Sequence, residues 1–269
     1  MSIEFKDSAG AKGYRVATVS LETIKAAGLV EAESRWCLWR AEWDAKRGGD
    51  KPAKVPMNTR GARISVSRLD DWLGFDEAAA GFESGKYDGV GLLMSSYAQI
   101  NGGLVGLDLD RCLEADGTIA VKAVDVVADF LALGGYIEVS PSGRGLRQFL
   151  KGVRLDDFKE KCKVHGLFDL EVYDPDSDRY LTVTGQPYPV GSEAGAVVAN
   201  QTALEAFISR WCERVPEAAA MQFDESQAAG VKRSSDEVLK LLKTYNKRGK
   251  ISRLLAGDTA DYGGNSEAD

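Results

Sequence analysis

The amino-acid sequence predicts a mixed α+β domain in which short strands alternate with amphipathic helices. Residues 168–173 and 179–184 alternate apolar and polar side chains with period two, as half-buried strands do. Residues 119–133 place apolar side chains at helical spacing. A glycine-containing turn at residues 140–145 joins two further strand-like runs, which indicates antiparallel neighbours. Together these features favour a sheet with both tight turns and helical connections.

The amino-terminal elements are expected in the following order. A helix over residues 20–32 begins at a serine that can cap it. The apolar run at residues 36–39 predicts a buried strand, and the Gly-, Lys- and Pro-rich residues 47–56 predict a loop. A helix over 75–84 and a strand over 90–94 complete this part.

The remaining elements carry the candidate chemistry. We expect strands at residues 104–110, 136–139, 146–150, 168–173 and 179–184, and helices at 119–133 and 201–214. The predicted catalytic domain therefore spans residues 1–215. Residues 216–233 are poor in large apolar side chains and predict a linker. Residues 234–269 predict a small helical segment that looks truncated.

Composition excludes some classes of site. No apolar run approaches the roughly 20 residues of a membrane-spanning helix, so a soluble, cytoplasmic protein without membrane partners is expected. The four cysteines are widely spread without Cys-x-x-Cys spacing, so no zinc is expected and reduced thiols are predicted. The single histidine, His165, has no partner at metal-ligand spacing.

The charge is unevenly distributed along the chain. The net charge is −7, yet Arg35–Arg68 holds nine basic and three acidic residues, and Lys232–Arg253 holds eight and two. Each stretch therefore carries a local net charge of +6. Such segregation gives an acidic protein a surface that attracts phosphates, although a merely solvated surface fits either stretch equally well.

Two aspartates at the end of one predicted strand form the candidate metal site. Asp108 and Asp110 point to the same face because side chains alternate along a strand. Adjacent carboxylates suit a hard cation such as Mg²⁺ or Mn²⁺, whereas the alternative is a strand end with two solvated acids. If the strand at 168–173 is a neighbour, Glu171 joins them, with Asp169 as the competing third ligand.

The turn at Ser140–Gly145 is the candidate phosphate site. Its glycines permit positive φ, and its amides and hydroxyls could cradle a triphosphate, with Arg144 and Arg147 adding charge. An ordinary hairpin loop is the alternative. Arg179 precedes a strand, where it could clamp phosphate or cap the strand edge. Trp36 and Trp39 could stack on bases, but packing fits them at least as well.

Six segments, in order, resemble the primase-polymerase domain of the archaeo-eukaryotic primase superfamily, in the form found in phage and plasmid replication proteins. The resemblance covers roughly residues 34–190 and is carried by the following segments: Trp36–Arg40, Lys51–Pro56, Val105–Asp110, Val139–Arg147, Leu170–Tyr173 and Arg179–Gly185.

This resemblance implies a two-lobed α+β fold whose catalytic sheet is similar to an RNA-recognition sheet. It implies metal ligation, by two Mg²⁺ or Mn²⁺ ions, at Asp108, Asp110 and Glu171. Nucleotide contacts are implied at Ser140, Ser142, Gly143, Arg144, Arg147 and Arg179, and nucleic-acid contacts are expected at Arg40, Lys51 and Lys54. Many family members have histidine where this chain has Arg147, which keeps the charge but cannot shuttle a proton at neutral pH.

The expected activity is therefore that of a DNA primase-polymerase in phage or plasmid replication. Its partners would be a single-stranded DNA template, a primer, nucleoside triphosphates and, in a longer protein, a replicative helicase in the host-cell cytoplasm. Two alternatives remain. One is a catalytically inactive module that binds single-stranded nucleic acid, and the other is a metal-dependent nuclease, which needs no triphosphate cradle.

Overall fold

The computed structural model describes residues 3–32, 34–43, 51–97, 103–153, 158, 161–164, 168–175, 177 and 179–213. All of them belong to one compact unit, Met1–Val215. The expected linker at 216–233, the helical segment at 234–269, the basic stretch at Lys232–Arg253 and His165 lie outside the described residues. No helix in the described part of the chain is long and apolar enough to cross a membrane.

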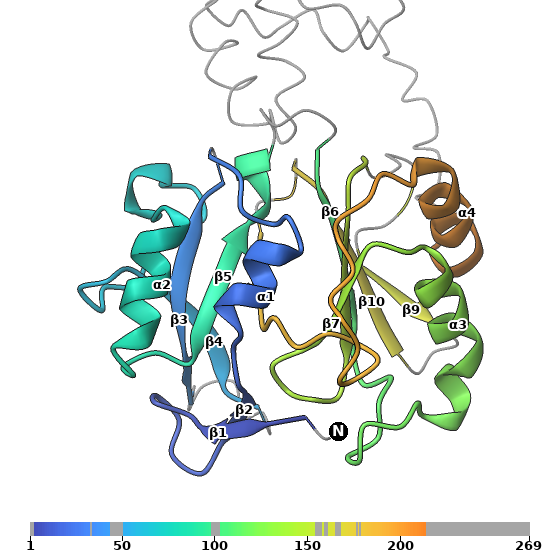
Figure 1. Ribbon diagram of the computed structural model, residues 1–269. Helices are drawn as coiled ribbons and strands as arrows, with labels where there is room; N and C mark the ends of the chain where they lie inside the picture. The colour runs from blue at the N-terminus through green and yellow to red at the C-terminus, as the bar shows by residue number, and fades with distance from the viewer. Residues whose placement is uncertain are drawn as a thin grey trace, which may run out of the picture. The chain divides into compact units, whose positions relative to one another are not determined.

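A five-stranded antiparallel sheet carries most of the predicted site. Its strand order is β7-β8-β6-β10-β9, and its strands are β6 (Val105–Leu109), β7 (Tyr136–Val139), β8 (Leu146–Leu150), β9 (Lys161–Val164) and β10 (Phe168–Tyr173). Helices α3 (Val124–Ala132) and α4 (Gln201–Trp211) cover one face, as Figure 1 shows. Leu107 and Leu109 point into this helix-covered core, so Asp108 points to the opposite face.

A second antiparallel sheet has four strands in the order β11-β5-β3-β4. These strands are β3 (Trp36–Glu42), β4 (Ala53–Met57), β5 (Gly89–Leu93) and β11 (Tyr180–Val183). Helices α1 (Leu21–Ala26) and α2 (Phe75–Glu83) pack on it through one apolar cluster, in which the rings of Trp36 and Phe75 meet edge to face at 4.9 Å. Both Trp36 and Trp39 are buried, so they pack rather than offer stacking surfaces.

The two sheets share a core. Tyr136, Phe149 and Tyr173, on the face of the five-stranded sheet opposite α3, join the cluster that contains Trp36 and Leu181. Gly106 lies in the same aromatic row, where a Cβ atom would overlap Leu181 Cδ1. Glycine at this position therefore permits the close approach of β11 to the five-stranded sheet.

The smaller elements complete the fold. A hairpin of β1 (Phe5–Asp7) and β2 (Arg15–Ala17) precedes α1, and short 3₁₀ turns lie at Leu69–Asp71, Met94–Tyr97 and Val121–Ala123. Helix α1 begins where Ser20 accepts a hydrogen bond from the Thr23 amide at 3.3 Å.

The mixed α and β composition is confirmed, as is the type of most elements. The expected loop at 47–56 is wrong in part, because residues 53–57 form β4. Strand β4 lies at the sheet edge, where Pro56 costs no ladder hydrogen bond. The helix expected over 20–32 ends at Ala26, since Gly28 has a φ of +76° that a helix cannot contain. The hairpin β1–β2 and the strand β9 were not predicted.

Candidate active site

One residue from each strand of the five-stranded sheet lies in a single transverse line on the face opposite α3. The pairing register places these five charged side chains directly across from their neighbours, because opposed residues in a sheet share a face. We call this line the charged row, and it consists of Glu138, Arg147, Asp108, Glu171 and Lys161. The strand bearing Glu171 is thus a neighbour of the strand bearing Asp108, which is the condition under which Glu171 joins the aspartate pair.

Asp108 is held by a bidentate ion pair with Arg147. Arg147 Nε and Nη2 donate to the two carboxylate oxygens at 3.2 and 3.1 Å, and the side chains are only 4% and 12% exposed. Burial alone would raise the pKa of the Asp108 carboxyl, but the Arg147 guanidinium beside it lowers that pKa below its ordinary value. Asp108 is therefore ionised at neutral pH.

A second transverse line follows at the open end of the same face. We call it the end row, and it consists of Ser140, Gly145, Asp110, Asp169 and Lys163. The Asp110 amide donates to the Asp169 carbonyl at 2.9 Å, and the Ser140 amide donates to the Gly145 carbonyl at 2.9 Å. Burial, and then the charge of Asp108, raise the pKa of Asp110. No described side chain donates a hydrogen bond to the Asp110 carboxylate, which leaves it available to a cation.

The two candidates for the third ligand occupy different rows. Glu171 lies opposite Asp108, and its carboxylate accepts hydrogen bonds from Lys161 Nζ and the Tyr173 hydroxyl. Asp169 is opposite Asp110 and pairs with Arg111 at 3.1 Å and with a β9 lysine at 2.6 Å. Both carboxylates share the face of the aspartate pair, so register alone leaves Glu171 and Asp169 as alternatives.

These carboxylates can be tested against the divalent cation that the resemblance implies. Their oxygen donors are of the type that Mg²⁺ or Mn²⁺ prefers, and Asp108, Asp110 and Glu171 share one face. Among the described residues, however, no group of three or more His, Cys, Asp or Glu side chains is already gathered closely enough to hold an ion. Arg147 and Lys161 occupy two of the carboxylates instead. The donor set fits a cation, provided that Lys161 releases Glu171, because each Asp108 oxygen keeps a second lone pair beside the one that Arg147 occupies.

The turn at Ser140–Gly145 borders the end row. The hydroxyls of Ser140 and Ser142 are 3.0 Å apart, and the Ser142 hydroxyl accepts the Arg144 amide at 3.3 Å. Gly143 has a φ of +70°, and a Cβ there would overlap the Phe5 ring. The β1–β2 hairpin thus packs beneath this turn, with the Ala17 amide donating to the Pro141 carbonyl at 2.9 Å.

The three arginines expected at the triphosphate have different surroundings. Arg147 is buried and, besides Asp108, donates to the carbonyl and hydroxyl of Thr182 on β11. Arg144 donates to the Leu113 carbonyl at 2.8 Å and approaches Glu114 at 3.5 Å, so it fastens the turn to the loop after β6. Arg179 is exposed immediately before β11. Of the three, Arg147 is fully engaged in the protein interior.

The basic residues expected at nucleic acid are also separated. Lys54 lies opposite Ala41, while Arg40 lies opposite Val55, so the two basic side chains project from opposite faces of the four-stranded sheet. Burial, followed by the charge of Arg147, lowers the pKa of Lys54 to about 8, against the attraction of Asp108 and Asp110. Lys54 therefore belongs electrostatically to the carboxylate site, whereas Arg40 projects from the other face of the sheet. Lys51 is exposed in the segment before β4.

Sequence reasoning missed Glu138, Lys161 and Thr182. Glu138 is fully buried, and its carboxylate accepts the amides of Thr184 and Gly185 at 3.0 and 2.9 Å. Burial raises its pKa, which the nearby charge of Arg147 opposes. An acid inside the apolar run Tyr136–Val139 was the available signal, because a buried carboxylate requires partners. All four cysteines are buried and none forms a disulfide with another cysteine, in agreement with the expected reduced state.

Comparison with known proteins adds one relative. The chain is 29% identical over 167 residues to a protein of Nitratiruptor phage NrS-1 that is named DNA primase-polymerase. The aligned region covers 61% of this chain and 21% of the phage protein, so the chain spans about a fifth of that relative's length. No family model matches the chain. A chain with a mixed α/β fold and a row of charged side chains across one sheet is thus similar to a phage DNA primase-polymerase.

Proposed function

We propose that this chain is a nucleotidyltransferase that extends DNA in the manner of a primase-polymerase. The observation that carries the proposal is the placement of Asp108, Asp110 and Glu171 on one face of adjacent strands, beside the Ser140–Gly145 turn. The similarity to the phage protein supports the same activity. In this proposal the two sheets correspond to two lobes, with the five-stranded sheet as the catalytic, RNA-recognition-like one.

Two Mg²⁺ or Mn²⁺ ions held by Asp108, Asp110 and Glu171 would supply activation of the primer hydroxyl and charge stabilisation of the leaving pyrophosphate. The protein's own residues have separate tasks. The bidentate grip of Arg147 fixes the orientation of Asp108 and keeps it ionised. Lys161, once released from Glu171, remains a mobile cation beside the reacting phosphates. Its exposed side chain has the length and freedom for that change of partner.

The Ser140–Gly145 turn would bind the triphosphate. Its two serine hydroxyls, 3.0 Å apart, would donate to the phosphates, whereas the amides of Ser140, Gly143 and Arg144 already donate within the turn. Arg144 contributes by holding the turn, since its guanidinium donates to Leu113 rather than pointing into the end row. Lys54 supplies a cation on the side of the four-stranded sheet, and its pKa of about 8 leaves it mostly protonated at neutral pH.

A primer-extension assay tests the proposal. The full chain is incubated with a primed template, Mg²⁺ or Mn²⁺ and labelled nucleotides, and separately with an unprimed template. Extension or dinucleotide formation supports the proposal. Shortening of the DNA indicates a nuclease, and binding without turnover indicates an inactive module. Asp108→Asn and Glu171→Gln should each abolish synthesis, whereas Asp7→Asn, an exposed acid in the β1–β2 hairpin, is the matched control. Full synthesis by Asp108→Asn refutes the assignment of that residue.

The same assay with Asp169→Asn decides between the two candidates for the third ligand. Loss of synthesis in Glu171→Gln but not in Asp169→Asn assigns Glu171. The helicase partner, the phage or plasmid setting and the cytoplasmic location stay predictions.

A further inference from the structure

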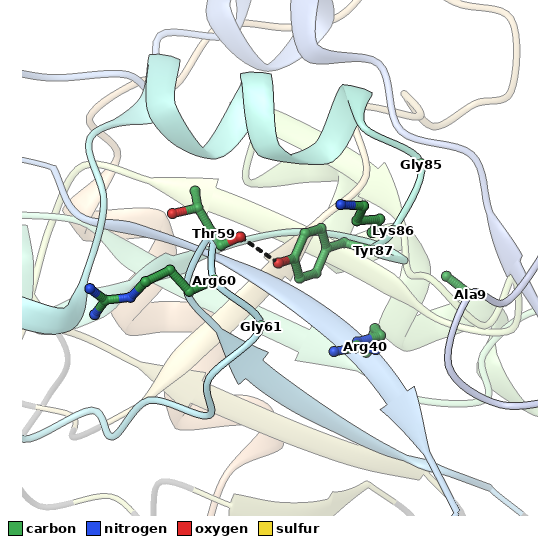
Figure 2. A pocket seen from close by; sticks show the side chains of 8 residues that line it. All are labelled: Ala9, Arg40, Thr59, Arg60, Gly61, Gly85, Lys86 and Tyr87. Carbon is green, nitrogen blue, oxygen red and sulfur yellow. Dashed lines mark hydrogen bonds between the residues drawn. The ribbon is translucent and has the colours of Figure 1, made fainter.

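A separate pocket of about 470 Å³ lies at the end of the four-stranded sheet. Figure 2 shows the residues that line it around the ring of Tyr87. They come from β3, from the turn after β4, from the segment between α2 and β5, and from the β1–β2 connection. The lining residues are Ala9, Arg40, Thr59, Arg60, Gly61, Gly85, Lys86 and Tyr87. Three of these are basic and none is acidic.

The three cations have no acidic partner among the described residues. Arg40 donates from Nε to the thioether sulfur of Met57 at 3.2 Å, and its guanidinium lies 5.7 Å from the centre of the Tyr87 ring. Arg60 and Lys86 are exposed and form no ion pair in the described part of the chain. By contrast, Arg63, just beyond the same turn, pairs with Glu42. In the described part of the chain, the pocket therefore carries three positive charges that form no salt bridge.

The walls of the pocket are held by a dense hydrogen-bond network. The Asn58 side chain accepts the amides of Arg60 and Ala62 at 3.1 Å each. The buried Tyr87 hydroxyl bonds to the carbonyls of Asn58 and Thr59 at 3.1 and 3.0 Å, and the latter bond is drawn in Figure 2. This network fixes the turn that carries Arg60, so one wall of the pocket is formed before a ligand arrives.

The pocket is distinct from the carboxylate rows. No residue of the five-stranded sheet lines it. Arg40 projects from the face of the four-stranded sheet opposite to Lys54, whose charge belongs to the carboxylate site. A ligand in the pocket is therefore held outside the proposed site of nucleotide addition.

We propose that this pocket binds a phosphate group of a nucleic-acid strand and anchors that strand away from the carboxylates. Arginine side chains suit phosphate because their planar forks donate two parallel hydrogen bonds. The Tyr87 ring is only 3% exposed, so it offers no surface for base stacking. Recognition is therefore of the backbone and independent of sequence. The identity of the anchored strand rests on the proposed function.

Binding of single-stranded DNA tests the anchor without catalysis. Anisotropy of a labelled oligonucleotide is measured against NaCl concentration, with a chelator present and nucleotides absent. The slope of log affinity against log salt should fall by about 0.7 for each phosphate-neutralising cation removed. Arg60→Met/Lys86→Met alters two exposed side chains, and Arg40→Met is added to it as a second variant. Arg63→Met is the matched control because Glu42 already neutralises Arg63.

The anchor is supported if the double variant weakens binding of all sequences alike, flattens the salt dependence of binding and leaves the thermal midpoint unchanged. Arg63→Met should alter neither the DNA affinity nor its salt dependence. Oligonucleotides with and without a 5′-phosphate identify the source: equal affinity indicates an internal phosphodiester, and a 5′-phosphate preference lost in the variants indicates a terminal phosphate. Unchanged DNA binding overturns the proposal, as does an equal loss of DNA affinity in Arg63→Met. The proposal is also overturned if the pocket binds inorganic phosphate but no DNA. Because no turnover is measured, absence of synthesis would not alter this result.

Discussion

Arg147 offers the sharpest test of how the charged row is stabilised. Its guanidinium lies between Asp108 and the fully buried Glu138, and Arg147→Met removes the cation while keeping much of the side-chain volume. Breaking a buried ion pair by deleting one partner typically costs about 3–5 kcal/mol, because the remaining charge is left uncompensated. With a urea m-value of about 3 kcal/mol/M for a domain of this size, the unfolding midpoint should fall by about 1–2 M.

The loss of unfolding free energy in Arg147→Met should be smaller in acid. Without Arg147, burial raises the folded-state pKa values of Asp108 and Glu138 above those in the unfolded chain. A carboxyl with a raised folded pKa destabilises the fold above that pKa, and the penalty disappears as the pH falls toward the unfolded value. The difference between variant and wild type should therefore be smaller at pH 5 than at pH 7.

Urea unfolding followed by tryptophan fluorescence at both pH values measures this. Arg144→Met is the matched control, because that arginine is 45% exposed and its loss should cost about 1 kcal/mol or less. Asp108→Asn should cost less than Arg147→Met, since the charge of Glu138 still faces the guanidinium. The reasoning is refuted if the urea midpoint of Arg147→Met equals that of Arg144→Met. It is also refuted if the loss of unfolding free energy in Arg147→Met is larger at pH 5 than at pH 7.

Three further predictions concern stability and reactivity. The pKa of Lys54 is about 8 in the folded chain, below its value in the unfolded chain. The folded chain therefore binds fewer protons than the unfolded chain between these values, and thermal stability should rise from pH 8 toward 10. Lys54→Met should flatten that rise. Gly106→Ala should lower stability by about 1–3 kcal/mol in urea unfolding through overlap with Leu181, whereas Gly74→Ala, which meets open space, should cost less. Burial raises the pKa of Cys112 to about 12, so a thiol reagent at pH 8 should react with this thiol only after unfolding; rapid reaction of the native thiol contradicts its burial.

Local patterns predicted much of the fold. The alternation in residues 104–110 placed Leu107 and Leu109 in the core and both aspartates on the other face, as the structure shows. Strand β4 was missed because its proline and lysine resemble a loop, and only its place at a sheet edge makes it compatible with pairing. Which strand lies at an edge is set by tertiary contacts that a local pattern does not contain.

The candidate site was predictable in its residue types but not in its pairing. The spacing of Asp108 and Asp110 indicated a shared face, and the strand predicted around Glu171 is present. The burial of Arg147 could not be predicted, because an arginine beside a turn is usually exposed. Its partners, Asp108 and Thr182, are 39 and 35 residues away in sequence. Long-range register decides whether such a cation meets the substrate or another side chain.

The charged row has a consequence for folding as well as for chemistry. Apolar alternation has period two, so it penalises a strand that pairs one residue out of place but tolerates one that slips by two. A two-residue slip of β8 would set Gly145 or Phe149 opposite Asp108 in place of Arg147 and would bury the acid without a counter-charge. The line of opposed charges therefore distinguishes the alignments that the apolar pattern leaves equivalent. The residues proposed for catalysis thus also help to select the correct register of the strands that carry them.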